Sequence, residues 1–343
     1  MSHTGEFSRQ RLLPARAAHA VSAGGSAVLV LRCAAASVVL SALFALPAVS
    51  QRKPAPAPPP ALTPTVALDR ALTRAFGSRE GAGVVVEVKS GNILAARDLP
   101  LAAHRLVLPG STVKTFVLLT LLESGKLRPV EPFVCPYHLT IAGMRLDCPH
   151  PEKLGQMYPA AALAWSCNNF FARMATRLSP LELARGLARW GFASPTRLAR
   201  DERTGDIATV FTQPELELEA LGEFGIHATP LEVLQAYRRL ALRRQNPAAQ
   251  DPSLDVVFEG LEAGVRYGMA SAARTDRLSV AGKTGTARSE DGAGTHAWFA
   301  GFAPADAPEI ALVIYLERGN GPVDASAIAH TVLAAWRDTR PRR

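Results

Sequence analysis

The sequence predicts an α+β fold, in which an antiparallel sheet is flanked by helices and carries a mostly helical lobe. Strand-like apolar patterns occur in two separated regions, at 84–88 and 93–96 around a turn at 90–92, and again at 278–287, 295–302 and 309–317. Helical patterns occupy the interval and the end, at 112–125, around 169–178, at 181–190, at 230–244 and near 323–337. Strands at both ends with helices between them indicate one sheet that is completed by distant parts of the chain.

Residues 1–50 have the layout of a cytoplasmic tail followed by an export signal. Arg9, Arg11 and Arg16 precede an apolar stretch, and residues 33–49 form an uncharged run of 17 residues. This length is near the lower limit for a helix that spans a bilayer. The basic front end predicts that the remainder of the chain is sent outside the membrane. Small residues at 48–50 would also suit a signal peptidase, so an uncleaved anchor and a cleaved signal peptide both remain open.

A proline-rich linker is predicted over residues 51–66. Its proline density prevents a helix and favours an extended spacer. The prolines are Pro54, Pro56, Pro58, Pro59, Pro60 and Pro64. From residue 67 to residue 340 the composition is globular without a further break, so we assign one folded domain to 67–340.

Composition excludes several classes of protein. The chain has 343 residues, 48% of them hydrophobic, and a formal charge of +8. It is therefore neither disordered nor fibrous. Its arginines lie largely on predicted helices and at the C-terminus without interleaved aromatic residues, so no nucleic-acid partner is expected. The sequence contains no G-x-S-x-G, H-E-x-x-H or C-x-x-C motif, and we expect no cofactor and no catalytic metal.

The first chemically informative motif is Ser111-Thr112-Val113-Lys114. A turn signal precedes it and an apolar helix follows it, so Ser111 should lie at a helix N-terminus, where free N–H groups favour developing negative charge. Lys114 is three residues further on and shares a helix face with Ser111. A buried lysine with a lowered pKa would activate this serine as a nucleophile. Taken alone, the tetrapeptide would be better explained as a capping serine beside a solvated lysine.

Two further motifs follow in the chain. Ser166-Cys167-Asn168 lies between apolar segments, where a buried hydroxyl and amide suggest a proton relay and a substrate clamp, although a helix cap would explain the motif equally well. Lys283-Thr284-Gly285-Thr286 lies on a predicted strand, with Gly285 leaving room for an extended peptide to pair with the strand edge. A phosphate-binding loop would need a glycine at position 277, which is Arg277, so we reject that interpretation.

From about residue 80 to residue 336 the chain resembles the transpeptidase domain of a class B-like penicillin-binding protein. This family cross-links peptidoglycan and shares the β-lactamase/transpeptidase-like fold with the serine β-lactamases. The resemblance depends on the three motifs, which occur in one order within longer matching segments. These segments are 108–114, 121–125, 166–171, 229–231, 283–287 and 296–302.

The resemblance implies a serine acyltransferase. Ser111 would attack the carbonyl group between the two terminal D-alanines of a stem peptide, with Lys114 as the base. Ser166 would pass the proton to the leaving D-alanine, and Lys283 would support the electrostatics. The same serine would be acylated by β-lactams.

The remaining site residues would bind substrate. The resemblance implies that Asn168 holds the amide of the acyl chain and that Thr284 and Thr286 bind the substrate carboxylate. The backbone N–H groups of Ser111 and Thr286 would form the oxyanion hole. The implied partners are stem peptides, β-lactams and, through the N-terminal segment, the membrane, so the catalytic domain is expected on the outer (periplasmic) side of the cytoplasmic membrane, or free in the periplasm after cleavage.

Three functions remain open from the sequence. The first is a D,D-transpeptidase or the related carboxypeptidase, in which water replaces the acceptor amine. The second is a class D-like β-lactamase, which usually carries valine where Asn168 stands and lacks the threonine at the position of Thr286. The third is a non-catalytic β-lactam sensor or scaffold, because fold alone does not determine function.

The sequence contains four cysteines. Cys33 belongs to the export segment, and Cys167 is expected to be a small buried filler. Cys135 and Cys148 flank a hairpin-like stretch, so we expect a disulfide between them on an oxidising exterior. The alternative is a zinc site formed by Cys135, Cys148 and either His138 or His150. His296 is expected to be a structural residue beside the sheet.

Overall fold

The computed structural model describes residues 63–246 and 251–340. The export segment predicted over 1–50 and most of the predicted linker lie outside these residues. Helix α1 (Pro64–Phe76) begins with proline at its first position, where the fixed φ suits a helix start. The helix therefore includes the last residues of the stretch that the sequence assigned to the linker. Among the described residues, no helix has both the length and the apolar character needed to cross a membrane.

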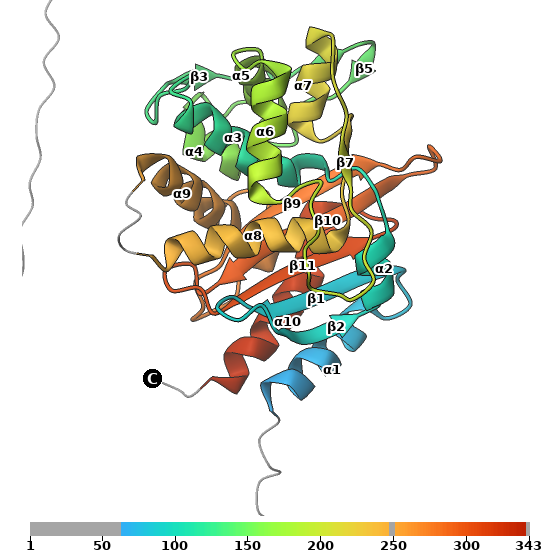
Figure 1. The fold of residues 1–343 in the computed structure, drawn as a ribbon. Helices are drawn as coiled ribbons and strands as arrows, with labels where there is room; N and C mark the ends of the chain where they lie inside the picture. The colour runs from blue at the N-terminus through green and yellow to red at the C-terminus, as the bar shows by residue number, and fades with distance from the viewer. Residues whose placement is uncertain (1–62, 247–250, 341–343) are drawn as a thin grey trace, which may run out of the picture. The chain divides into compact units, whose positions relative to one another are not determined.

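A five-stranded antiparallel sheet forms the centre of the domain, in the order β2-β1-β11-β10-β9. The strands are β1 (Gly81–Glu87), β2 (Ile93–Arg97), β9 (Ala281–Arg288), β10 (Thr295–Ala303) and β11 (Ile310–Leu316). Strand β1 pairs with β11 in antiparallel register, from Gly81 opposite Leu316 to Glu87 opposite Ile310. Figure 1 shows the cyan strands β1 and β2 in one sheet with the orange strands β9, β10 and β11, which come from much later in the chain. The predicted α+β fold, with its sheet closed by distant segments, is confirmed.

The two faces of the sheet are covered by different helices. Helices α1 and α10 (Ser326–Thr339) pack together on one face, and α8 (Pro230–Arg244) lies across the other face (Figure 1). Successive residues of β11 alternate between these layers, because side chains of a strand point to opposite faces. Leu312 and Ile314 join the α1/α10 core, whereas Val313 and Tyr315 join the α8 core.

A helical lobe extends beyond α8, as Figure 1 shows. Its helices are α3 (Lys114–Glu123), α4 (Pro159–Ala164), α5 (Asn168–Ala175), α6 (Pro180–Trp190) and α7 (Gln213–Leu221), and α9 (Pro252–Arg266) packs against α4 and β9. The remaining short elements are α2 (Leu99–His104), β3 (Phe133–Val134), β4 (Thr140–Ile141), β5 (Met144–Arg145), β6 (Gln156–Met157), β7 (Asp206–Ile207), β8 (Ile226–His227), η1 (Gly110–Val113), η2 (Ser271–Ala273) and η3 (Gly321–Ala325).

Several helices are absent from the sequence-based prediction. Helix α7 alternates glutamate with leucine, a pattern closer to a strand period, yet Thr212 and Glu215 form a reciprocal capping box at its start. Helix α9 begins with Asp251 capping the N–H of Ser253 and proline at its first turn. Capping side chains are therefore the signal that identifies α7, whereas α9 also has helical apolar spacing at Leu254, Val257, Phe258 and Leu261.

Candidate active site

Ser111 lies in the 3₁₀ turn η1, between strand β9 and helix α3. Gly110, just before it, has φ +52° in the left-handed region that favours glycine. A Cβ atom at this position would come within 2.9 Å of the Thr286 carbonyl oxygen. The N–H of Gly110 donates to the Gly222 carbonyl at 3.1 Å. The turn that carries Ser111 is thus packed closely on the edge strand of the sheet.

Helix α8 and strand β10 also hold the backbone around this turn, through Tyr237 and Trp298. The hydroxyl group of Tyr237 is fully buried, donates to the Thr112 carbonyl at 2.9 Å and lies 2.8 Å from Thr115 Oγ1. Trp298 Nε1 donates to the Leu108 carbonyl at 3.2 Å. Both contacts connect the backbone next to Ser111 to the core, which limits how far the serine can move.

Lys114 begins helix α3 with a completely buried side chain. Its Nζ donates to the Ser166 carbonyl at 3.0 Å, lies 3.4 Å from Ser166 Oγ, and contacts Asn168 Oδ1. The ammonium also lies 5.4 Å from the centre of the Phe171 ring. The sequence predicted Lys114 beside Ser111, and this stays a prediction; the hydrogen bonds of the Lys114 amine in the structure go to the second motif, at Ser166 and Asn168.

Ser166 connects the two lysines of the site. It lies in the loop between α4 and α5 with φ +53°, a backbone conformation that is strained for a residue with a side chain. Lys283 Nζ, from strand β9, donates to Ser166 Oγ at 2.8 Å and to the Thr284 carbonyl at 3.0 Å. One hydroxyl group is therefore shared by two lysines that are 169 residues apart in the sequence.

Burial governs the protonation of these amines. It lowers the pKa of Lys114 to about 8, against the opposing effect of nearby groups that include Glu223. Burial also lowers the pKa of Lys283 well below its usual value, and the neighbouring Lys114 lowers it further. Two ammonium charges around one hydroxyl in a water-poor site repel each other. A neutral amine next to Ser166 is consequently accessible near neutral pH.

Both the oxygen and the nitrogen of the Asn168 side-chain amide have hydrogen-bond partners. Its Oδ1 accepts from Lys114 Nζ, and its Nδ2 donates to the carbonyl groups of Leu146 and Asp147 at 3.0 and 3.1 Å. In the structure this residue positions the lysine and ties down the segment at 146–147. Its predicted contact with the substrate amide stays a prediction.

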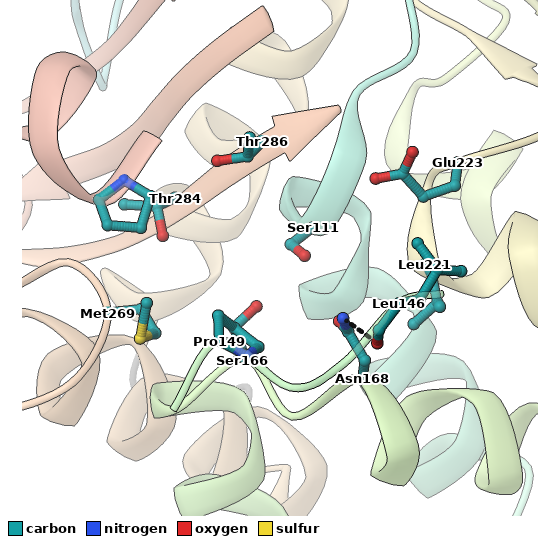
Figure 2. Close-up of a pocket in the computed structure, with 11 residues that line it drawn as sticks. Ser111, Leu146, Pro149, Ser166, Asn168, Leu221, Glu223, Met269, Thr284 and Thr286 are labelled. Atoms are coloured by element: carbon teal, nitrogen blue, oxygen red, sulfur yellow. Dashed lines mark hydrogen bonds between the residues drawn. The ribbon is translucent and has the colours of Figure 1, made fainter. Parts of the chain in front are cut away.

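A pocket of about 120 Å³ opens onto these groups. Figure 2 shows Ser111 directed between the strand that carries Thr284 and Thr286 and the loop that carries Ser166. The full lining is Ser111, Leu146, Pro149, Ser166, Asn168, Leu221, Glu223, Met269, Thr284, Thr286 and Pro322. All three motifs therefore contribute to one concave site.

Glu223 is a member of this lining that the sequence motifs did not include. Its carboxylate faces the pocket across from Thr286, and the N–H of Arg288 approaches it at 3.5 Å (Figure 2). Burial raises the pKa of Glu223. The glycines at 222 and 225, both in the left-handed region, mark a turn in the sequence but do not show that Glu223 enters the pocket.

Gly285 packs against the turn that carries Ser111, and its predicted role toward a bound peptide stays a prediction. A Cβ atom there would come within 2.9 Å of the Pro109 carbonyl and 3.0 Å of Thr112 Cγ2. The glycine allows the serine-bearing turn to pack against the strand, and it is not among the residues that line the pocket. Strand β9 is still the edge of the sheet, as an added peptide strand would require.

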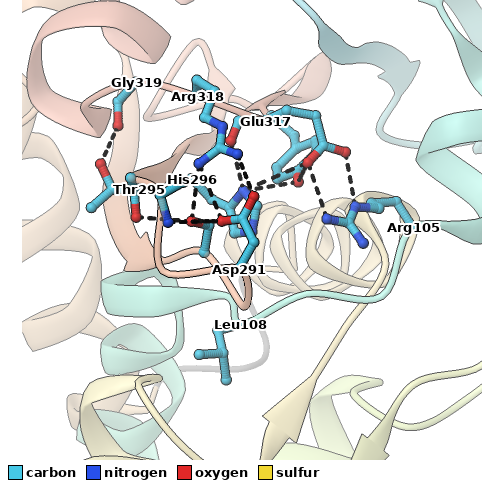
Figure 3. A network of polar contacts seen from close by, with 12 residues as sticks. Arg105, Leu108, Asp291, Thr295, His296, Glu317, Arg318 and Gly319 are labelled. Atoms are coloured by element: carbon cyan, nitrogen blue, oxygen red, sulfur yellow. Dashed lines mark hydrogen bonds and ion pairs between the residues drawn. The ribbon is translucent and has the colours of Figure 1, made fainter.

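His296 lies in a separate polar network at the start of β10 (Figure 3). Its Nδ1 lies 2.9 Å from the Glu317 carbonyl and 3.1 Å from the Tyr315 hydroxyl. The Glu317 carboxylate accepts from Tyr315 and, at 2.8 Å, from Arg105. His296 does not line the Ser111 pocket, and its contacts are those of a structural residue.

The cysteines differ from the prediction. Cys135 and Cys148 are not joined, because their sulfur atoms are 3.5 Å apart, whereas a disulfide bond is about 2.05 Å long. Cys167 was expected to be a filler, but its sulfur contacts both of the others, at 3.4 and 3.7 Å. The sequence could not show this cluster, since Cys167 comes from a different loop.

Comparison with known proteins gives independent evidence on the family of this chain. The family model described as "Penicillin binding protein transpeptidase domain" matches residues 81–335. The matched segment includes the three motifs, the whole sheet and all the elements of the lobe. It covers well over half of the chain.

The curated relatives align with this chain over only part of their own length. The chain is 27% identical over 299 residues to the "Probable peptidoglycan D,D-transpeptidase PbpC" of Pseudomonas aeruginosa, covering 73% of this chain and 51% of that protein. It is 22% identical to the "Peptidoglycan D,D-transpeptidase MrdA" of Acinetobacter baumannii, covering 68% and 43%. The chain thus spans about half the length of the curated relatives that it matches.

Solved structures show the same fold. The D,D-transpeptidase domain of a peptidoglycan glycosyltransferase from Eggerthella lenta superposes with a TM-score of 0.68 at 24% identity, covering 79% of this chain and 81% of that one. PBP2 of Pseudomonas aeruginosa superposes with a TM-score of 0.69 at 23% identity, covering 78% and 76%.

Proposed function

Because the chain belongs to the family of penicillin-binding protein transpeptidase domains, we propose that it is a peptidoglycan D,D-transpeptidase that forms an acyl-enzyme on Ser111. The observation that carries the proposal is the Ser166 hydroxyl, held by two buried lysine amines in the pocket that Ser111 lines. A serine, a base of lowered pKa and a relay hydroxyl are the groups that acyl transfer needs.

Acylation uses the first two motifs. Lys114 in its neutral form takes the proton of Ser111 as Oγ bonds to the carbonyl carbon between the terminal D-alanines. The proton then passes by way of Ser166 to the amine of the departing D-alanine, and the carbon–nitrogen bond breaks. The N–H groups of Ser111 and Thr286 stabilise the oxyanion, each contributing about 3 kcal/mol to the lowering of the barrier.

Transfer repeats these steps in reverse with a second stem peptide. An amine of the acceptor bonds to the acyl carbon and gives its proton through the same relay to Ser111, whose bond to the carbon breaks. Thr284 and Thr286 offer hydroxyl groups to the donor's terminal carboxylate, and Lys283 supplies positive charge beside it when protonated. Asn168 orients the acyl chain through its amide.

We also propose that residues 1–50 place this domain on the outer side of the cytoplasmic membrane. Three arginines followed by the apolar run at 33–49 support export. Cell fractionation with N-terminal mass analysis tests the location. An intact N-terminus in the membrane fraction indicates an anchor, and a start near residue 50 in the periplasmic fraction indicates cleavage. Recovery in the cytoplasm would refute export.

The activity is tested with the full chain and a stem pentapeptide, with and without an acceptor peptide. We expect D-alanine release and, with the acceptor, a cross-linked product. Ser111→Ala should abolish both, because no other group replaces the nucleophile. Ser124→Ala is a matched control, since Ser124 is exposed and only donates to the Leu121 carbonyl.

The other outcomes separate the alternative functions. Release of D-alanine without a cross-linked product at any acceptor concentration would indicate a carboxypeptidase. Rapid repeated hydrolysis of a penicillin would indicate a β-lactamase. Failure of the folded protein to react with either peptide or penicillin would indicate a scaffold.

A further inference from the structure

Four metal-binding side chains meet on the far side of the Ser166-Cys167-Asn168 segment. They are Cys135, Cys148, His150 and Cys167, and their ligand atoms all lie within 4.8 Å of one another. Cys148, His150 and Cys167 are each at most 3% exposed, and Cys135 is half-buried. Their ligand atoms are close enough together for one metal ion to contact all four.

The sulfur spacing matches a metal ion better than a disulfide. The three sulfur–sulfur distances are 3.4, 3.5 and 3.7 Å. A tetrahedral zinc ion with zinc–sulfur bonds of about 2.3 Å holds its sulfurs about 3.8 Å apart. A disulfide would shorten one pair to about 2.05 Å and leave the third cysteine without a partner. Three nearly equal distances therefore describe three corners of a tetrahedron.

His150 supplies the fourth corner. Its Nδ1 lies 2.7 Å from the Pro151 carbonyl, and this bond assigns the proton to Nδ1 and the lone pair to Nε2. Nε2 is buried and has no hydrogen-bond partner among the described residues. An imidazole oriented by a carbonyl on one nitrogen and free on the other is the usual arrangement of a zinc ligand.

Every sulfur of the cluster also accepts a hydrogen bond from a neighbouring N–H group. The backbone of Tyr137 donates to Cys135 at 3.2 Å, and that of Phe170 donates to Cys167 at 3.4 Å. Asn169 donates to Cys148 from its backbone at 3.5 Å and from its side chain at 3.4 Å. Such donors stabilise thiolates, which are the form that binds metal.

We propose that Cys135, Cys148, His150 and Cys167 bind one Zn²⁺ ion as a closed, structural site. Binding releases the three thiol protons to solvent and requires no oxidant. With four protein ligands the ion has no open position for substrate, so it takes no part in the chemistry on Ser111. The zinc site is therefore independent of the proposed function, and either one can be refuted without the other.

The position of the site gives it a consequence for catalysis. Cys167 lies between Ser166, which contacts both lysines, and Asn168, which contacts Lys114. Asn168 also donates to the carbonyl of Asp147, the residue before Cys148. Zinc would therefore join the loop around 146–150 to the loop that carries the second motif. Its removal should disorder both loops without removing any catalytic group.

The first test is the metal content of the full chain purified from zinc-containing medium, measured by elemental mass spectrometry. We expect one zinc per chain, lost in His150→Ala. His138→Ala is the matched control, because His138 is exposed, lies 3.3 Å from an Asp147 carboxylate oxygen, and is outside the cluster. Cys33→Ser, the cysteine outside the described residues, should also retain the metal. Iron in place of zinc, or no metal at all, would overturn the assignment.

A second measurement does not depend on any variant folding. Cobalt replacing zinc in the wild-type chain should give thiolate-to-cobalt charge transfer and the intense visible bands of tetrahedral cobalt. Asn169→Ala should weaken zinc binding by about 10- to 100-fold, because it removes the side-chain N–H group that donates to Cys148. Thiol titration of the unfolded, unreduced protein should find all the cysteines free. Finding two fewer free thiols than after reduction would mean a disulfide and would refute the site.

Discussion

The two faces of the central sheet differ in what they bury. The face covered by α1 and α10 is packed with aliphatic side chains such as Leu312 and Ile314. The side of α8 and the helical lobe contains, among the described residues, the buried lysine, histidine and glutamate side chains, which are Lys114, His150, Glu219, Glu232, Lys283 and His296. Burying an ionisable group costs free energy unless partners offset it. Both sides therefore have an apolar core, but only the side of α8 and the lobe also buries the charged groups of the candidate site.

The largest expected effect is on the polar side. Lys114→Met removes the proposed base but retains the buried stem of the side chain. Acylation by a penicillin should slow by about 10²- to 10⁴-fold, the usual contribution of a general base. The rate is measured by stopped-flow under single-turnover conditions. Lys126→Met is the control, because Lys126 pairs with Glu182 at the surface and should leave the rate unchanged.

Substitution on the face covered by α1 and α10 should lower stability and leave the acylation rate unchanged. Ile314→Ala leaves a cavity in the α1/α10 core, and the free energy of unfolding should fall by about 2–5 kcal/mol. The acylation rate of the folded protein should not change. Val130→Ala, at a side chain that is 73% exposed, should change stability by less than about 0.5 kcal/mol. A slower reaction in Ile314→Ala at full folding would show that the faces are not separable.

The pH dependence of acylation follows from burial of Lys114. The amine acts as a base only when it is deprotonated, and burial lowers its pKa to about 8. Below that pH the single-turnover rate should rise about tenfold per pH unit, and above it the rate should level off. A rate that is constant from about pH 6 to about pH 9, or that falls as pH rises, would exclude Lys114 as the base.

A smaller effect is expected at Tyr237, because this side chain packs in the core and also holds the turn next to Ser111. Tyr237→Phe removes the hydroxyl that contacts the Thr112 carbonyl and Thr115. The free energy of unfolding should fall by about 0.5–1.5 kcal/mol, and acylation should slow by about twofold to tenfold through the displaced turn. Tyr158→Phe removes an exposed hydroxyl that only accepts from Gln156 and should affect neither.

The sequence predicted the parts of this molecule that local patterns encode. Alternating apolar residues located the five strands of the sheet, and the order of the three motifs identified residues that meet in one pocket. Local patterns could not show that Gly285 makes room for the Ser111 turn, because that contact joins segments far apart in the chain. The same limit applies to Glu223, whose place in the pocket depends on how the lobe packs.

The cysteines show this limit most clearly. The sequence pointed to Cys135 and Cys148 as a pair, because they flank one short stretch. Cys167 belongs to a motif that already had an interpretation, and only the folding of the lobe brings its sulfur within 3.4 and 3.7 Å of theirs. The sequence already offered a zinc site with Cys135, Cys148 and a histidine as an alternative to the disulfide, and the structure adds Cys167 to that set.

The central claim is that Ser111 is the nucleophile of a site completed by Lys114, Ser166 and Lys283. Intact mass measurement of the full chain after incubation with a penicillin, followed by peptide mapping, tests it most directly. We expect one drug molecule bound per chain, attached to Ser111, and no adduct in Ser111→Ala. An adduct on a different residue of the folded protein, or a Ser111→Ala variant that is still acylated, would contradict the account.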